Sequence, residues 1–132
     1  RPMIRIGMST KQVMIVVILG VVLWYLAALL AQFLGHIGAF DGTNRVILYA
    51  AAVPASAPSV LLIWKAAGLD RSQIAIGMAV ATTAAMLCDG VALAWFSTLY
   101  GANAEQIAAS GAVILWGAAV GQCLAFLLNR PV

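Results

Sequence analysis

Four long stretches of this sequence carry almost no charge, and they restrict the folds open to the chain more than any other feature. They cover about residues 12–34, 46–64, 72–100 and 106–128, and among them only the third contains a charged residue, Asp89. A helix that crosses the hydrocarbon core of a bilayer needs about 20 consecutive apolar residues. The sequence therefore predicts an all-α integral membrane protein with four transmembrane helices.

The composition argues against the soluble classes of protein. Hydrophobic residues make up 64% of the 132 residues and charged residues only 8%, whereas a soluble domain carries about 25% charged residues. So few charges cannot cover a soluble domain or form a nucleic-acid interface, and we expect no nucleic-acid partner. The two cysteines are too few for a secreted module held by several disulfides.

The segments between the four stretches are short and polar. They cover about residues 35–45, 65–71 and 101–105 and are rich in glycine, asparagine or charge, as turns are. Short connections make consecutive helices antiparallel neighbours. We therefore expect residues 1–132 to form a single transmembrane domain, a four-helix antiparallel bundle.

The basic residues predict which side each connector faces. Arg45 lies in a connector on one side, and the other six basic residues fall on the opposite side, in the two tails and the second connector: Arg1, Arg5, Lys11, Lys65, Arg71 and Arg130. Basic loops stay in the cytoplasm. We expect both termini to be cytoplasmic, in a multi-pass protein of a bacterial inner membrane whose anionic lipids contact the basic side.

Asp89 is the acidic residue that lies well inside a predicted helix. It sits about ten residues from the outer end of its stretch, or roughly 15 Å deep at the helical rise. Acidic residues inside membranes are rare and mark functional sites. Two interpretations stay open: a proton or cation site, or a protonated carboxyl group that hydrogen-bonds to a neighbouring helix.

The same depth on the other helices predicts the surroundings of Asp89. Ten residues from the outer end lead to Tyr25 on the first helix, Ser56 on the second, and Trp116 with Gly117 on the fourth. We expect these residues to form one intramembrane polar layer with Asp89.

The second helix contains two prolines, Pro54 and Pro58, spaced four residues apart. Each proline removes a helical hydrogen bond and kinks the helix. One interpretation is a broken helix that lines a binding cavity, as in transporters. The other is a static kink that curves the helix around the bundle.

Two further features are candidates for packing and for ligand binding. Gly117 and Gly121 form a GxxxG pair, which lets helices approach closely. His36 follows the first helix and is a possible ligand for a metal, haem or pigment, or a solvated interfacial residue. Because no second histidine or acidic cluster accompanies it, we expect no metal site.

Several segments resemble a family of small bacterial membrane proteins whose domain has no known function. The resemblance rests on residues 32–36, 77–90, 95–96 and 115–117. It implies four helices and makes Asp89 a feature shared with the family, but it implies no activity.

The sequence contains no catalytic set, because it has no phosphate-binding glycine loop, Ser/His/Asp set or HExxH motif. We therefore expect a non-enzymatic protein. The first hypothesis is an accessory or structural subunit of a larger membrane assembly that packs against other transmembrane subunits and lipids, with a bound lipid, quinone or pigment as the candidate cofactor. The alternative is a small proton-coupled transporter or channel that uses Asp89 beside the kinked second helix.

Overall fold

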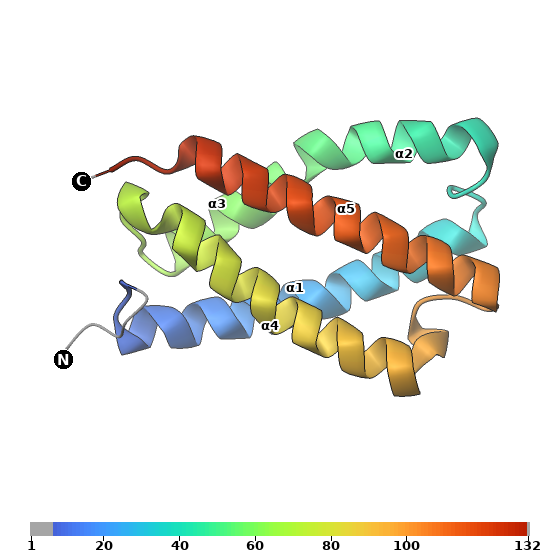
Figure 1. Ribbon diagram of the computed structural model, residues 1–132, viewed down its shortest axis with the longest axis horizontal. Helices are drawn as coiled ribbons and strands as arrows, with labels where there is room; N and C mark the ends of the chain where they lie inside the picture. Colours follow the sequence, from blue (N-terminus) through green and yellow to red (C-terminus); the bar gives the residue numbers. More distant parts are fainter. Residues whose placement is uncertain (1–6, 132) are drawn as a thin grey trace.

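The computed structural model describes residues 7–131, which form helices joined by short turns (Figure 1). The elements in chain order are α1 (Thr10–His36), α2 (Gly42–Ala55), α3 (Ala57–Ala66), η1 (Arg71–Gln73), α4 (Ile74–Trp95), η2 (Ser97–Leu99) and α5 (Ala104–Leu128). Since α2 with α3 and η1 with α4 each form one continuous segment, four segments are long and apolar enough to cross a membrane. This confirms the predicted all-α fold with four such helices.

The main difference from the predicted boundaries lies at the end of the third stretch. The sequence predicts a helix to about residue 100, but α4 ends at Trp95, and the backbone of Phe96 leaves the helical region with φ −134° and ψ 41°. The short helix η2 follows, and it places Tyr100 in the interior with no exposed surface. The prediction of a helix over residues 96–100 is therefore wrong, because the burial of Tyr100 takes precedence over helix continuation.

The helices pack unequally. Helix α1 packs along α4, α5 contacts both, and α3 contacts α1, α4 and α5. Helix α2 packs mainly against α5 and has no buried residue. Figure 1 shows α2 at the edge of the molecule, beside α5. One of the long segments therefore divides into an inner part, α3, and an outer part, α2.

Glycines permit the closest helix contacts. A Cβ atom added at Gly20 of α1 would lie 2.5 Å from the carbonyl oxygen of Ala81 on α4, so the two backbones touch there. A Cβ at Gly121 of α5 would lie 2.9 Å from Cε of Met78 on α4. Gly117, its predicted GxxxG partner, has no such neighbour within 4 Å. Small residues at helix crossings gain packing contacts in this way.

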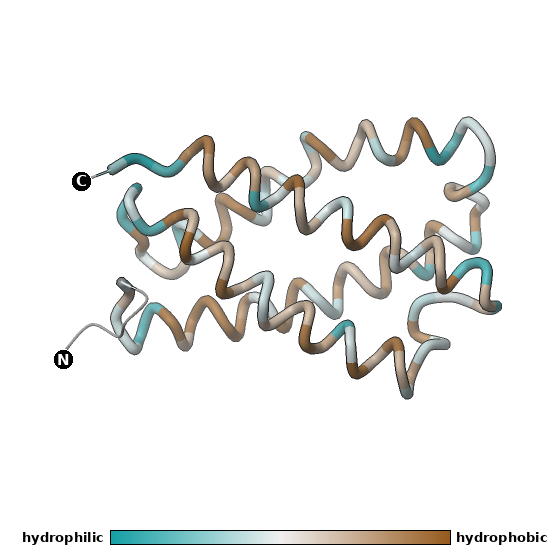
Figure 2. The backbone as a smooth tube through the Cα atoms, in the orientation of Figure 1, coloured by the Kyte–Doolittle hydropathy of each residue, from teal (hydrophilic) through white to brown (hydrophobic). Residues whose placement is uncertain are grey.

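Hydrogen bonds tie the two ends of the chain to η1. Arg71 donates to the carbonyl of Leu128 at 2.9 Å and accepts from the amide of Arg130 at 2.9 Å, while Gln73 donates to the carbonyl of Gly7 at 2.9 Å. Figure 2 shows the hydrophilic residues gathered towards the ends of the elongated molecule. The start of α1 and the end of α5 therefore lie at the same end, the terminal end of the molecule. The predicted cytoplasmic residues Arg1 and Arg5 fall outside the described residues.

Candidate intramembrane site

Asp89 ends a chain of hydrogen bonds that joins three parts of the fold. The Tyr100 hydroxyl donates to Oδ1 of Asp89 at 2.7 Å, and Nε1 of Trp24 donates to the Tyr100 oxygen at 2.9 Å. Trp24 comes from α1, Asp89 from α4, and Tyr100 from the turn after η2. Both donors point along the chain towards Asp89, so its Oδ1 is the terminal acceptor.

Local contacts fix Tyr100 in this position. The hydroxyl of Ser110, fully buried on α5, donates to the Tyr100 carbonyl at 2.7 Å. The next residue is Gly101, where a Cβ atom would lie 2.7 Å from Cβ of Gln106, so the turn can pass against α5 only with glycine there. Burial, and to a lesser degree the hydrogen bond to Asp89, raise the pKa of Tyr100 well above its usual range. The phenol therefore keeps its proton and remains a donor.

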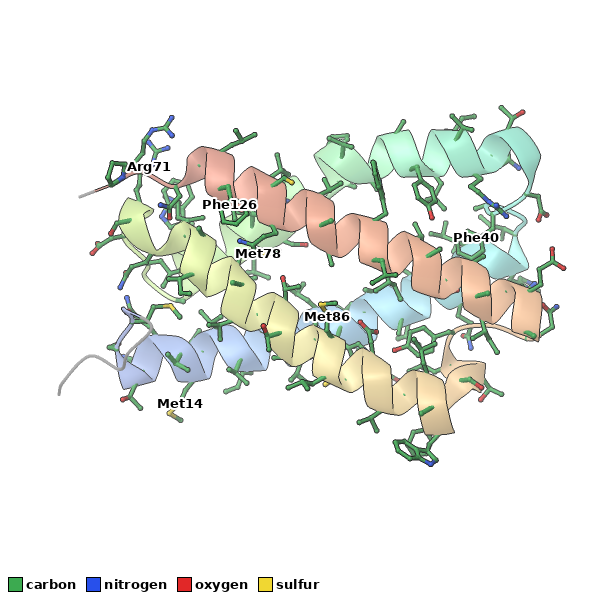
Figure 3. All side chains as sticks on the ribbon, viewed as in Figure 1. Met14, Phe40, Arg71, Met78, Met86 and Phe126 are labelled. Carbon is green, nitrogen blue, oxygen red and sulfur yellow. The ribbon has the colours of Figure 1, made fainter. Side chains whose placement is uncertain are left out.

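A cavity of about 450 Å³ lies beside Asp89, and residues of α1, α2, α3, α4 and α5 line it. Sites for small molecules usually have volumes of about 300–1,000 Å³. The lining is mainly aliphatic, and Met78 and Met86, labelled in Figure 3, are two of its members on α4. Its polar or polar-tipped members are few: Trp24, Ser56, Ser59, Thr82 and Asp89. Asp89 is therefore the charged group of a largely apolar cavity.

The break between α2 and α3 borders the same cavity. Pro54 lies in the last turn of α2 and Pro58 in the first turn of α3, with Ser56 between the two helices. Proline fits the first turn of a helix because the amide that it lacks has no helical partner there. The Ser56 hydroxyl donates to the carbonyl of Ala52 at 2.7 Å, which satisfies one polar group near the break. Ser56 and Ser59 both line the cavity.

The structure brings together only part of the polar layer predicted from depth. Asp89, Ser56 and Gly117 line the cavity, whereas Tyr25 and Trp116 do not. Tyr25 is 48% exposed, and its ring lies against Trp24 with centroids 5.8 Å apart. Trp24 is thus the α1 residue of this layer that joins the hydrogen-bond chain. Depth along a helix does not distinguish two adjacent residues, which point about 100° apart.

Trp116 and His36 lie away from Asp89. The Trp116 indole donates to the carbonyl of Tyr49 on α2 at 3.0 Å, and the two rings lie 5.4 Å apart. Trp116 therefore holds α2 against α5. His36 is exposed at the last turn of α1. Among residues 7–131, no group of three His, Cys, Asp or Glu side chains is placed to hold a metal ion.

Sequence reasoning missed Tyr100 and Trp24 as partners of Asp89. The predicted helix ran to Tyr100, because no charged residue follows Asp89 up to that position. The segment 97–101 contains serine, threonine and glycine, which favour turns. If these turn-forming residues are given more weight, the predicted helix ends before residue 97. The chain can then turn back and place Tyr100 towards the interior.

Comparisons of the chain with protein-family models, with curated proteins and with solved structures find no match. The resemblance to a family of small bacterial membrane proteins therefore stays a prediction. Four helices that can each cross a membrane nonetheless identify the chain as a multi-pass membrane protein by length and composition.

Proposed function

We propose that the chain crosses a bacterial inner membrane four times as an antiparallel bundle, with its terminal end in the cytoplasm. The charges of the described residues support this orientation, because Lys11, Lys65, Arg71 and Arg130 belong to the terminal end and Arg45 to the opposite one. The ring of Trp64 lies 3.9 Å from Nζ of Lys65 at the same end. An aromatic ring next to basic groups is typical of a membrane–water interface.

Reporter fusions test this topology. A green fluorescent protein fused after Arg130 should fluoresce, and alkaline phosphatase fused there should be inactive, because the phosphatase folds only outside the cytoplasm. The reverse result is expected for fusions after Ala39, in the turn between α1 and α2. Active phosphatase after Arg130 would contradict the orientation.

Within the membrane we infer a non-enzymatic function: the protein holds a lipid-soluble small molecule, such as a lipid, quinone or pigment, between its own helices. One observation carries this inference, the cavity of about 450 Å³ that all five α-helices line. An apolar cavity with a few polar groups is the common form of a ligand site. In a membrane protein such a molecule enters from the bilayer.

Purification with a matched cavity-filling variant tests this function. The protein extracted in mild detergent should carry a lipid-soluble molecule at a fixed ratio, detected by native mass spectrometry. Gly117→Leu should lose that molecule, because Gly117 lines the cavity and has open space at its Cβ. Gly90→Leu is the control, since Gly90 also has open space but does not line the cavity. Equal occupancy in all three proteins would overturn the inference.

The alternative, a small proton-coupled transporter or channel, is favoured by one specific observation. Asp89 and the break at Ser56 border the same cavity, and broken helices at binding sites are typical of transporters. Liposomes with a pH-sensitive dye inside test it. Wild-type protein should dissipate a pH gradient faster than Asp89→Asn, and equal rates in the two would rule out this alternative.

A role as an accessory subunit is supported by a different surface. An apolar groove runs along α4 and α5, and small residues, among them Ala75, Ala79 and Ala119, form part of its floor. Small residues let a partner transmembrane helix approach closely. A partner subunit should co-purify in mild detergent and be lost with Ala79→Phe, but not with Val91→Phe, a change of an exposed residue outside the groove. A lone, monodisperse wild-type protein would contradict this role.

A further inference from the structure

We propose that the molecule held in the cavity is a lipid-soluble organic cation, and that Asp89 is its counter-ion. This inference rests on the proposed function, since it names the chemical class of ligand for the same cavity. It concerns an amine or quaternary cation with an apolar body.

The charge on the lining of the cavity is of one sign, negative. Among the described residues that line it, Asp89 is acidic and none is lysine, arginine or histidine. A carboxylate inside a membrane without a partner is costly, and a cation that enters the same site offsets that cost. No described residue on the cavity wall is basic, so a cationic ligand would be the first positive group beside Asp89.

The hydrogen bonds of Asp89 favour the charged carboxylate. Tyr100 donates to Oδ1 at 2.7 Å, and Trp24 in turn donates to Tyr100 at 2.9 Å. Donors aligned towards a carboxylate stabilise its charge and strengthen one another. Among the described residues, the donor to Asp89 reaches Oδ1, and Asp89 itself lines the cavity.

The walls select the kind of cation. The side chains around Asp89 are mostly aliphatic, with Met78, Met86 and the indole of Trp24 among them. Hard metal cations require several oxygen ligands, which this lining does not supply. An indole ring attracts organic cations through its π-electrons, and methionine side chains adapt to bulky apolar shapes. The cavity therefore fits an apolar body that carries one positive centre.

Two probe ions of equal shape and opposite charge test the proposal. Tetraphenylphosphonium and tetraphenylborate differ mainly in charge, and triphenylphosphine oxide is a neutral probe of similar apolar character. Binding to the purified full chain is measured by equilibrium dialysis, with protein-free micelles subtracted. We expect Asp89→Asn to weaken tetraphenylphosphonium binding by about tenfold or more, as close charge pairs do, and to leave the other two probes unweakened.

Two controls keep this test decisive. Asparagine can still accept the hydrogen bond of Tyr100, so Asp89→Asn should keep the fold, which circular dichroism checks. Glu105→Gln removes an exposed acid in the first turn of α5 and should leave all binding unchanged.

The outcomes distinguish the cation proposal from the proposed function, ligand binding in the cavity. If Asp89→Asn binds tetraphenylphosphonium as tightly as the wild type does, the cation proposal is overturned while ligand binding in the cavity stands. If wild-type protein binds none of the three probes, both the cation proposal and the proposed function fail.

Discussion

The half of the molecule near the chain termini and the half around Asp89 are packed in different ways. Near the termini, α1, α3, α4 and α5 enclose a continuous buried cluster of aliphatic side chains that includes Val16, Val60 and Ile74. Around Asp89 the buried hydrophobic cluster consists of Ala28, Ala92 and Tyr100. The first half is closed by packing, and the second relies on hydrogen bonds beside a cavity.

The break at Ser56 accounts for the difference. Before the break, α2 has no buried residue; after it, α3 buries Val60 and Ile63. One continuous apolar segment thus contributes to the core in one half and leaves space in the other. In this bundle, the position of the break at Ser56 therefore decides which half contains the space for a ligand.

The largest expected effect comes from the crossing of α1 and α4, where Ala81 of the closed cluster meets Gly20 at the border of the cavity. Gly20→Ala would place a Cβ 2.5 Å from the backbone oxygen of Ala81, which forces α1 and α4 apart. Overpacking of this kind costs about 1–3 kcal/mol, and we expect the upper end of that range in the free energy of unfolding, measured in mild detergent. Gly90→Ala is the matched control, because its Cβ meets open space. Equal stability of the two variants would contradict close packing at this crossing.

The next effect concerns the hydrogen bonds of the open half. Tyr100→Phe removes the hydroxyl that joins Trp24 to Asp89 and leaves a partly buried indole N–H without its acceptor. The loss should be about 1–3 kcal/mol, the cost of an unsatisfied buried group. Tyr25→Phe, at a residue that is 48% exposed, should change the unfolding free energy little. A neutral Tyr100→Phe would show that the chain of hydrogen bonds does not hold this half together.

The smallest effect sharpens the comparison by placing the same new side chain in each half. Gly117→Leu adds its side chain to the cavity, so we expect almost no change in the thermal unfolding midpoint when both proteins are free of bound ligand. Ala125→Leu adds a side chain at a residue that is fully buried in the closed cluster and does not line the cavity, and it should lower the midpoint clearly. If both variants unfold at the same temperature, the two halves do not differ in packing.

Much of the fold could be predicted from the sequence, because uncharged length alone defines membrane-crossing helices. The same argument failed where burial of one residue ended a helix: nothing in the hydropathy of residues 96–100 distinguishes Tyr100 from an interfacial tyrosine. The importance of Asp89 followed from its charge. The hydrogen-bond partners of Asp89 could not be predicted in this way, because they depend on which face of α1 packs on α4. The closest contact between these two helices lies at Gly20, and the hydropathy of α1 does not indicate which of its faces packs there.

The central claim is that the half around Asp89 contains a space that a lipid-soluble molecule can enter. An experimental structure of the protein under xenon pressure tests it directly, because xenon binds in apolar cavities. We predict xenon between α1, α4 and α5 near Ala85, a residue that lines the cavity, and none in the closed half around Val16. Helices packed together around Ala85 without xenon would contradict the account.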